Sequence, residues 1–547
     1  MAEFDNPSAP MNETQGDPSA RNTPAPPHRR ATTAAGVFIV MAGVLAYHNS
    51  LGGPFIFDDI TTIPENSTIR SLWPIWTALS PPKGGTPVQR RPIVNLSLAV
   101  NYAIGGLDVR GYHVFNLAVH ILAALTLFGV IRRTLGLSVV PEYIAAASLP
   151  LAFVAALIWT VHPLATEAVT YIIQRTELLA GLFYLLTLYC LIRGASASRS
   201  VWWNVAAVAA CALGMGSKEV VVSAPLVVLV YDRLFLCRAF KEVFHRRWGL
   251  YLPLASTWAL LVMLLGHGSE AAPGAVHVSV YVSRDVYWTA LPTYALMQLA
   301  AIVRYLGLCF WPHPLIVDYG HLPTGTVSLN PTHAIIVLFL LAATVRAFTK
   351  QPRLAFLSLW FFAILAPSST IIPVVGQPIA EKRMYLPLAG VVVIVVLGVY
   401  ALGRRIWDRL GAPDRLRSVL GRIVGLALAG AVALTLGVVT IRRNADYHSV
   451  MSIWHDTVEK RPYNYRAWNN RGVAHGQKGN HDKAIRDYTR AIELEPNYVR
   501  AYNNRAVAYF YNGNYDKARA DAKKAQVLGW KVTSTFLELL RKAPHED

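Results

Sequence analysis

The sequence predicts an all-α protein in which a polytopic membrane bundle is followed by a C-terminal α-solenoid. Three observations lead to this prediction. Of the 547 residues, 54% are hydrophobic and only 15% are charged, a balance typical of membrane proteins. Apolar segments long enough to cross a bilayer recur between residues 33 and 441. Beyond them, a more polar region repeats with a period of 34 residues.

The basic residues indicate how the bundle is oriented. The net charge of +19 is concentrated in short segments between apolar runs, such as 237–248 and 403–422. Short loops rich in Lys and Arg mark the cytoplasmic face of a membrane protein, so we expect no nucleic-acid partner. Residues 1–31 are rich in Pro, Ala, Asn and Thr and end in His-Arg-Arg. This composition predicts a disordered cytoplasmic tail.

The membrane domain is expected to occupy residues 32–445, with its first outer loop at 51–112. That loop is too polar to span, yet its Trp, Leu and Ile residues predict amphipathic helices along the interface. The apolar stretch 294–311 carries Arg304, and the chain must lie outside both before and after it. We therefore expect a re-entrant or interfacial helix there. About eleven spans are expected, at residues 33–50, 113–133, 143–161, 177–193, 201–216, 219–236, 249–266, 331–346, 354–372, 384–402 and 422–441.

The C-terminal region, residues 446–547, is expected to lie on the extracytoplasmic side. The segment that begins at Ala467 recurs at Ala501, and Pro462 and Pro496 are separated by the same interval. A 34-residue period with small residues at the helix crossings is the signature of the tetratricopeptide repeat. We expect two full repeats, a preceding half-repeat at 449–461 and a capping helix at 531–544.

Both repeats carry the sequence Asn-Asn-Arg on the predicted inner helix. These side chains could bind the extended backbone of an acceptor protein, and a purely structural role is an equal alternative. The candidate acceptor-binding residues are Asn469, Asn470, Arg471, Asn503, Asn504 and Arg505.

Charged side chains beside membrane spans are functional candidates, because burying a charge is costly. The adjacent carboxylates of Asp58 and Asp59 directly follow the first span. All the candidates fall on the predicted outer face, and the others are His162, Glu167, Arg175, Glu177, Lys218, Glu219, Asp318, Glu381, Lys382, Arg383 and Tyr385.

Structural alternatives remain open for these groups. The acidic doublet could cap a short helix, since Asp at a helix start satisfies free amides. Arg175 and Glu177 could form an interfacial ion pair. The Lys218–Glu219 turn could be a solvated hairpin tip.

Carboxylates and cations on one outer face fit the transfer of a sugar from a lipid phosphate. The polyprenyl tail would lie in the membrane, and the phosphate would need positive charge. A carboxylate would deprotonate the acceptor hydroxyl as it attacks the anomeric carbon. Cations would stabilise the leaving phosphate, and a single displacement would invert the anomeric centre. The reaction strictly requires no metal, so we expect no cofactor, although a divalent cation is compatible with it.

The order of the motifs resembles the TMTC family (transmembrane and tetratricopeptide-repeat proteins), which are protein O-mannosyltransferases of the GT-C superfamily, and its bacterial relatives. The series runs FDD after the first span, HPLATE, SKE, DYGH, EKRMYLP and then the repeats. The resemblance implies a dolichyl- or polyprenyl-phosphate mannose donor, Ser/Thr acceptors and an acidic base at Asp58 or Asp59. The family's eukaryotic members have longer repeat arrays, which affects the expected choice of acceptor.

The resemblance also implies where the donor binds. Matching motif positions place donor phosphate or sugar contacts at Glu167, Lys218, Glu219, Glu381 and Arg383. The full candidate donor set adds three outer-face residues, Arg175, Asp318 and Tyr385.

The sequence therefore predicts an inverting glycosyltransferase that acts on proteins at the extracytoplasmic face, with the repeats presenting the acceptor. A bacterial inner membrane is favoured, and the endoplasmic reticulum is the alternative. Two other functions are compatible with the sequence. One is transfer of the sugar to a lipid or cell-envelope glycan, and the other is a non-catalytic membrane scaffold.

Overall fold

The computed structural model describes residues 29–544, except residues 84, 267–283, 321–329, 372–376 and 412. Most of the predicted N-terminal tail lies outside the described residues. Its last three residues, 29–31, already belong to the first helix. The outer segment 267–330 is described over 284–320 and at residue 330.

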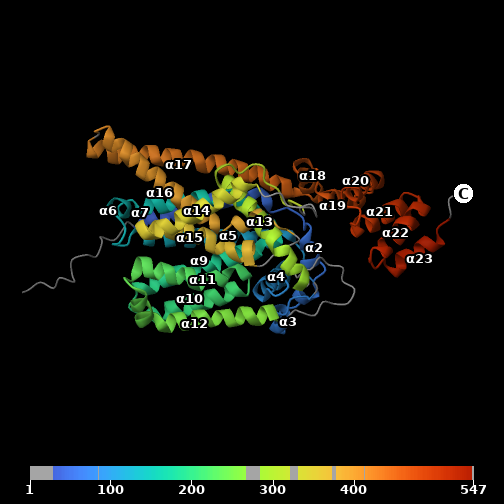
Figure 1. The fold of residues 1–547 in the computed structure, drawn as a ribbon, viewed down its shortest axis with the longest axis horizontal. Helices are drawn as coiled ribbons and strands as arrows, with labels where there is room; N and C mark the ends of the chain where they lie inside the picture. The colour runs from blue at the N-terminus through green and yellow to red at the C-terminus, as the bar shows by residue number, and fades with distance from the viewer. Residues whose placement is uncertain are drawn as a thin grey trace, which may run out of the picture.

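Long helices lie side by side and form the membrane bundle (Figure 1). Their apolar composition gives each of them a face that can contact lipid or a neighbouring helix. The helices of the bundle are α1 (Arg29–Tyr47), α5 (Val109–Leu135), α7 (Ser148–Thr160), α9 (Arg175–Ala195), α10 (Ser200–Met215), α11 (Ala224–Tyr231), α12 (Phe240–Gly266), α14 (Pro331–Lys350), α15 (Pro352–Ala366), α16 (Pro387–Arg409) and α17 (Asp414–Ala445), with the short α6 (Glu142–Ala145) between α5 and α7.

Eight helices in the described part of the chain are long and apolar enough to cross a membrane, and a bent pair brings the number to nine. The bent pair joins α7 to residues 163–170 with an angle of 52°. The two other predicted spans are shorter. Helix α10 has 16 residues, and residues 219–236 divide into the 3₁₀ helix η6 (Glu219–Ser223), α11 and the π-helix η7 (Asp232–Leu236).

The stretch predicted to be re-entrant or interfacial forms one continuous helix, α13 (Arg284–Phe310). Its Tyr294 hydroxyl donates to the carbonyl of Ser368, and its Gln298 amide donates to the carbonyl of Pro378. Both acceptors belong to the segment between α15 and α16, which includes η8 (Pro367–Ile371) and η9 (Glu381–Met384). Helix α13 is therefore continuous, and it contacts the connection between α15 and α16.

The first outer loop folds into short helices, as its amphipathic composition predicts. Trp73 and Trp76 remain 75% and 64% exposed, as expected for side chains at a membrane interface. The short outer elements are η2 (His48–Ser50), α2 (Asp58–Thr62), η3 (Ser67–Ile69), α3 (Ile75–Leu79), α4 (Pro92–Gly105), η4 (Pro163–Ala165), α8 (Thr166–Thr170) and η5 (Ile172–Gln174).

After η10 (Asp446–His448), six helices form the C-terminal solenoid. Small residues allow its helices to approach closely: a Cβ atom on Gly472 would lie 2.7 Å from the ring of Tyr488. Helices α18 and α23 occupy the positions expected for the half-repeat and the capping helix. The six helices are α18 (Val450–Lys460), α19 (Tyr465–Gln477), α20 (His481–Leu494), α21 (Val499–Tyr511), α22 (Tyr515–Val527) and α23 (Ser534–Lys542).

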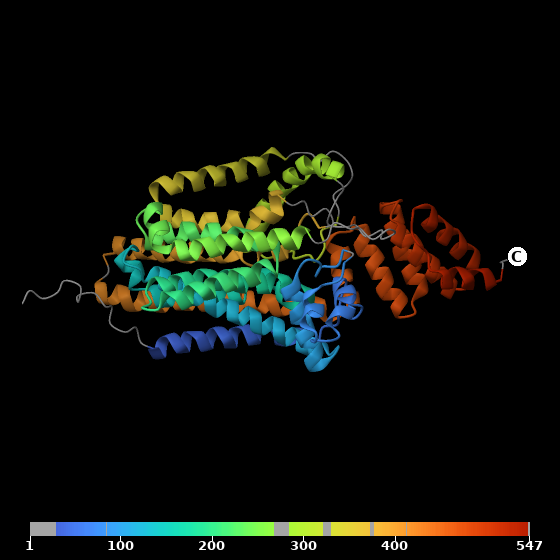
Figure 2. The same ribbon diagram turned by 90° about the horizontal axis from the view of Figure 1, so that it is seen from below.

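The repeats extend beyond the end of the bundle at which the first outer loop lies (Figure 2). This arrangement agrees with the expectation that both lie on one side of the membrane. The all-α class, the apolar spans and the C-terminal repeats are confirmed, and the described residues contain no strand.

Candidate active site at the outer face

The acidic doublet opens α2, and the backbone holds its two carboxylates differently. Asp59 is fully buried, and its two oxygens accept hydrogen bonds from the amides of Ile56 and Ile173 at 3.0 and 2.8 Å. Burial raises the pKa of Asp59 to about 8, against the effect of these two amides. Asp59 therefore ties the first outer loop to the start of the segment that leads into α9.

Asp58 is only half-buried, and it faces several groups of other segments. Its amide donates to the Tyr171 hydroxyl at 2.9 Å. Burial raises the pKa of Asp58, the positive charges of Lys382 and Arg466 oppose this rise, and the negative charge of Asp318 adds to it. Asp58 is thus the member of the doublet whose pKa responds to charged side chains of other segments, whereas the carboxylate of Asp59 is held by backbone amides.

Backbone strain directly precedes the doublet. Phe57 has φ +46°, in a region that side-chain-bearing residues rarely adopt, and such strain persists only where surrounding contacts hold it. One of these contacts is an edge-to-face packing of its ring on Trp454 of α18, with ring centroids 5.4 Å apart. The conformation at Phe57 therefore depends on a helix of the C-terminal region.

The 3₁₀ helix η9 carries charged residues toward the doublet. The amide of Lys382 donates to Glu167 at 3.0 Å, and its ammonium lies 3.4 Å from the other oxygen of the same carboxylate. Glu381 accepts hydrogen bonds from the amide of Ile316 at 2.7 Å and from the Tyr319 hydroxyl. Burial raises the pKa of Glu381 to about 7. Both carboxylates thus fix the position of η9.

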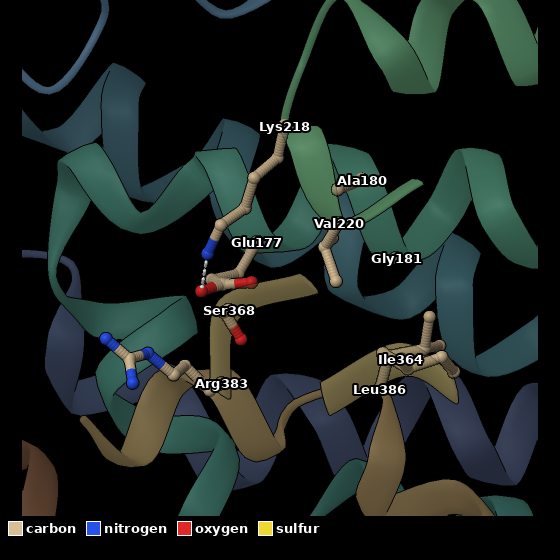
Figure 3. Close-up of a pocket in the computed structure, with 9 residues that line it drawn as sticks. All are labelled: Glu177, Ala180, Gly181, Lys218, Val220, Ile364, Ser368, Arg383 and Leu386. Carbon is tan, nitrogen blue, oxygen red and sulfur yellow. Dashed lines mark hydrogen bonds and ion pairs between the residues drawn. The ribbon is translucent and has the colours of Figure 1, made fainter. Parts of the chain in front are cut away.

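The next residue of η9, Arg383, lines a small cavity with Lys218 and Glu177, which form an ion pair. Figure 3 shows these charged groups on one side of the cavity and Ile364 and Leu386 on the other. The Arg383 guanidinium also donates to the carbonyls of Gln377 and Pro378. The cavity therefore places Arg383 and Lys218, the latter paired with Glu177, beside an apolar wall.

Glu219 follows Lys218 but points to another partner. Both of its carboxylate oxygens lie 3.2 Å from one guanidinium nitrogen of Arg91, at the start of α4. Burial raises the pKa of Glu219, but Arg91 and Lys218 outweigh it and lower the pKa to about 2. This ion pair links the first outer loop to the turn between α10 and α11.

Two residues of the predicted donor set, Arg175 and Tyr385, form hydrogen bonds with buried residues of the protein. Arg175 is fully buried and donates to Asn101 at 2.7 Å, and its guanidinium lies 4.6 Å from the ring centre of Phe115. The Tyr385 hydroxyl is bonded to His120 at 3.0 Å within a buried aromatic cluster. Neither residue lines the cavity of Figure 3.

Asp318, also predicted to contact the donor, joins the outer loop to the repeats. Its carboxylate accepts hydrogen bonds from the Gly320 amide at 2.9 Å and from the Arg466 guanidinium at 2.5 Å. Its carbonyl accepts a hydrogen bond from the Asn464 side chain at 2.9 Å. Asp318 is 1% exposed, so this ion pair is shielded from solvent.

The candidate acceptor-binding residues largely contact one another. The Arg471 and Arg505 guanidiniums each grip the aspartate 16 residues later, Asp487 and Asp521, through two hydrogen bonds. The asparagines form a ladder in which Asn504 donates to Asn469 at 3.0 Å, while Asn469 and Asn503 donate to Asn470 and Asn504. The arginines thus hold the two helices of each repeat together.

The structure brings three further residues to the doublet: Tyr171 and Arg466, which the sequence-based candidates omitted, and Lys382, which was a candidate without an assigned role. Lys382 was visible as part of the charged EKR segment, but the sequence did not show which of its residues faces the doublet. Tyr171 and Arg466 gave no recognisable signal, because each meets Asp58 through tertiary contact alone. Within the described ranges, no group of three or more His, Cys, Asp or Glu side chains is arranged to hold a metal ion.

The fold and this outer face define a polytopic membrane protein with a C-terminal tetratricopeptide region. Tetratricopeptide-repeat family models match residues 465–498 and 487–520. The chain is 24% identical over 488 residues to protein O-mannosyl-transferase TMTC3 of Mus musculus, which covers 83% of this chain and 50% of the relative. It is 25% identical over 516 residues to Tmtc3 of Drosophila melanogaster, covering 83% and 54%.

These comparisons confirm the resemblance expected from the motifs, and the chain is TMTC-like. It spans about half the length of the curated relatives it matches. Among solved structures, the apo oligosaccharyltransferase of Archaeoglobus fulgidus is similar with 12% identity and a TM-score of 0.41, over 77% of this chain and 56% of that one. A similarity of this size does not decide the fold.

Proposed function

We propose that the protein is an inverting glycosyltransferase that moves a sugar from a polyprenyl-phosphate carrier to Ser or Thr hydroxyls of proteins at the extracytoplasmic face. Mannose is the sugar that the names of the relatives suggest. A bacterial inner membrane with a periplasmic site is the location we favour, with the endoplasmic reticulum as the alternative. Partner proteins would bind through the repeats.

One observation carries this proposal: η9 joins the doublet to the cationic cavity. Lys382 acts on Asp58 and contacts Glu167, while the adjacent Arg383 lines the cavity with Lys218. A phosphate at the cavity would therefore meet two cations, and its isoprenoid chain could follow the apolar wall formed by Ile364 and Leu386. The sugar would project toward Asp58.

In this reaction, the Asp58 carboxylate accepts the proton of the acceptor hydroxyl as its oxygen bonds to the anomeric carbon. The bond from that carbon to the phosphate oxygen breaks, and the polyprenyl phosphate leaves with the electron pair. Lys218 and Arg383, the two cations at the cavity, stabilise the charge that develops on the leaving phosphate. Attack opposite to the leaving group inverts the anomeric centre.

The two aspartates have different roles in this proposal. Asp58 is the base because it is partly accessible and lies near charged groups of three segments. Asp59 positions it, since both Asp59 oxygens are occupied by backbone amides. Arg175, Tyr385 and the Arg91–Glu219 pair support the walls of the site through their internal contacts.

The experiment that tests this function uses the full chain reconstituted with a labelled polyprenyl-phosphate mannose and a Ser/Thr-rich acceptor peptide. Label should enter the peptide with the wild type, and not with Asp58→Asn. If label enters only lipid or glycan, the acceptor is a lipid or a cell-envelope glycan rather than a protein. Full biological activity of Asp58→Asn together with its loss on removal of residues 449–547 would indicate a scaffold.

A further inference from the structure

We propose that Arg466, on the first full-repeat helix, is a positioning residue of the glycosyl-transfer site, so that the repeat region completes this site rather than only presenting the acceptor. The inference rests on the proposed function. It assigns to the repeats a role in the reaction itself, which their resemblance to protein-binding modules does not indicate.

The C-terminal region holds the outer segment 315–320 through three side chains. Arg466 and Asn464 hold the carboxylate and the carbonyl of Asp318, as described above. The Lys460 ammonium donates to the carbonyl of Leu315 at 3.0 Å. Gly320 has φ +79°, and a Cβ atom there would lie 3.1 Å from the Asn464 side chain, so the contact requires glycine. Three side chains of the C-terminal region thus fix both ends of this segment.

The same outer segment contacts η9. The Ile316 amide and the Tyr319 hydroxyl both donate to Glu381, the first residue of η9. Lys382 and Arg383 follow directly in the chain. Lys382 contacts Glu167, and Arg383 lines the cationic cavity. A shift of segment 315–320 would therefore move Arg383, one of the two cations proposed to hold the donor phosphate.

Arg466 and Asp318 also influence the charge state of Asp58. The charged and titratable groups that act on the Asp58 carboxylate are Lys382 on η9, Tyr171 before η5, Arg466 on α19, Asp318 on the outer segment and its neighbour Asp59 on α2. The positive charge of Arg466 lowers the pKa of Asp58 against the rise due to burial, and the negative charge of Asp318 raises it. Arg466 and Asp318 form one ion pair, yet they act on Asp58 with opposite signs.

These opposite signs separate an electrostatic role from a purely mechanical one. The dependence of kcat on pH would be measured with the reconstituted full chain, labelled polyprenyl-phosphate mannose and acceptor peptide. In the plot of kcat against pH, the acid limb is the part where kcat falls as Asp58 becomes protonated. Arg466→Gln should move this limb to higher pH, because Asp58 would protonate more easily. Asp318→Asn should move the limb to lower pH. The double variant should return the limb toward the wild-type position.

Matched variants complete the test. Arg500 occupies the same position of the next repeat, 34 residues later. In the described part of the chain, no hydrogen bond or ion pair joins it to the outer segment, so Arg500→Gln should leave kcat and the pH profile unchanged. Arg466→Lys retains the charge and should keep the limb in place, with a smaller loss of kcat than the reduction of about tenfold or more expected for Arg466→Gln.

The outcomes are distinct. If Arg466→Gln and Asp318→Asn both lower kcat without moving the limb, or both move it in the same direction, Arg466 serves only as a docking contact and the inference is wrong. An Arg500→Gln variant as impaired as Arg466→Gln would overturn it equally. If the wild type transfers no sugar, the proposed function fails, and the inference falls with it.

Discussion

The two aspartates of the doublet should respond to the same substitution in different ways. Asp58→Asn removes the proposed base while keeping the size of the side chain. In the described part of the chain, backbone amides donate to the carboxylate of Asp59 and not to that of Asp58. Loss of a general base reduces the rate of transfer by about 10²–10⁴-fold. We therefore expect a folded variant that retains little activity, and a thermal midpoint close to that of the wild type.

Asp59→Asn should instead destabilise the outer loop. An asparagine has one acceptor oxygen, so only one of the amides of Ile56 and Ile173 can keep its hydrogen bond. The other amide would be buried without an acceptor, at a cost of about 1–3 kcal/mol in the free energy of unfolding. Activity should fall in proportion to the folded fraction.

The assay combines single-turnover transfer of labelled mannose with thermal unfolding of the reconstituted chain. The acid limb of the wild-type rate should lie above the ordinary pKa of an aspartate, because burial raises the pKa of Asp58 and the base acts only when deprotonated. The two roles are refuted if Asp58→Asn transfers sugar at the wild-type rate, or if Asp59→Asn leaves the thermal midpoint unchanged.

Two further predictions concern packing. Gly181→Ala places a methyl group 2.7 Å from the Tyr385 ring, so it should lower the free energy of unfolding by about 1–3 kcal/mol and lower the transfer rate. Gly425→Ala, where a Cβ atom meets nothing within 4 Å, is the control and should change neither quantity. Thermal unfolding and transfer assays measure both. Arg471→Ala leaves the buried Asp487 without its bidentate partner and should speed limited proteolysis of the repeats in the full chain. Equal proteolysis rates with weaker acceptor binding would instead assign Arg471 to the acceptor groove.

The sequence predicts the fold because its signals are local. Apolar runs of spanning length, basic inner loops and a 34-residue period each depend on neighbouring residues, and the structure contains the corresponding helices. Span 219–236 shows the limit of this reasoning. Its apolar composition suggests one helix, but the backbone passes through a 3₁₀ segment, an α-helix and a π-helix.

The candidate site could be predicted only in part, since the sequence shows residue types but not partners. The position of Asp58 and the charges of η9 follow from the motifs. Arg175 has the right charge for a phosphate, yet its partner Asn101 lies 74 residues away and takes the guanidinium into the core. The pairing of Asp318 with Arg466 spans 148 residues, so no local pattern could reveal that the repeats reach the site.

The most direct measurement is a structure of the full chain with a bound, non-hydrolysable polyprenyl-phosphate mannose analogue. Our account predicts its phosphate at the cavity between Lys218 and Arg383, its sugar directed at Asp58, and the repeats on that same side of the membrane. A phosphate bound at the opposite end of the bundle, or a sugar beyond reach of the Asp58 carboxylate, would contradict it.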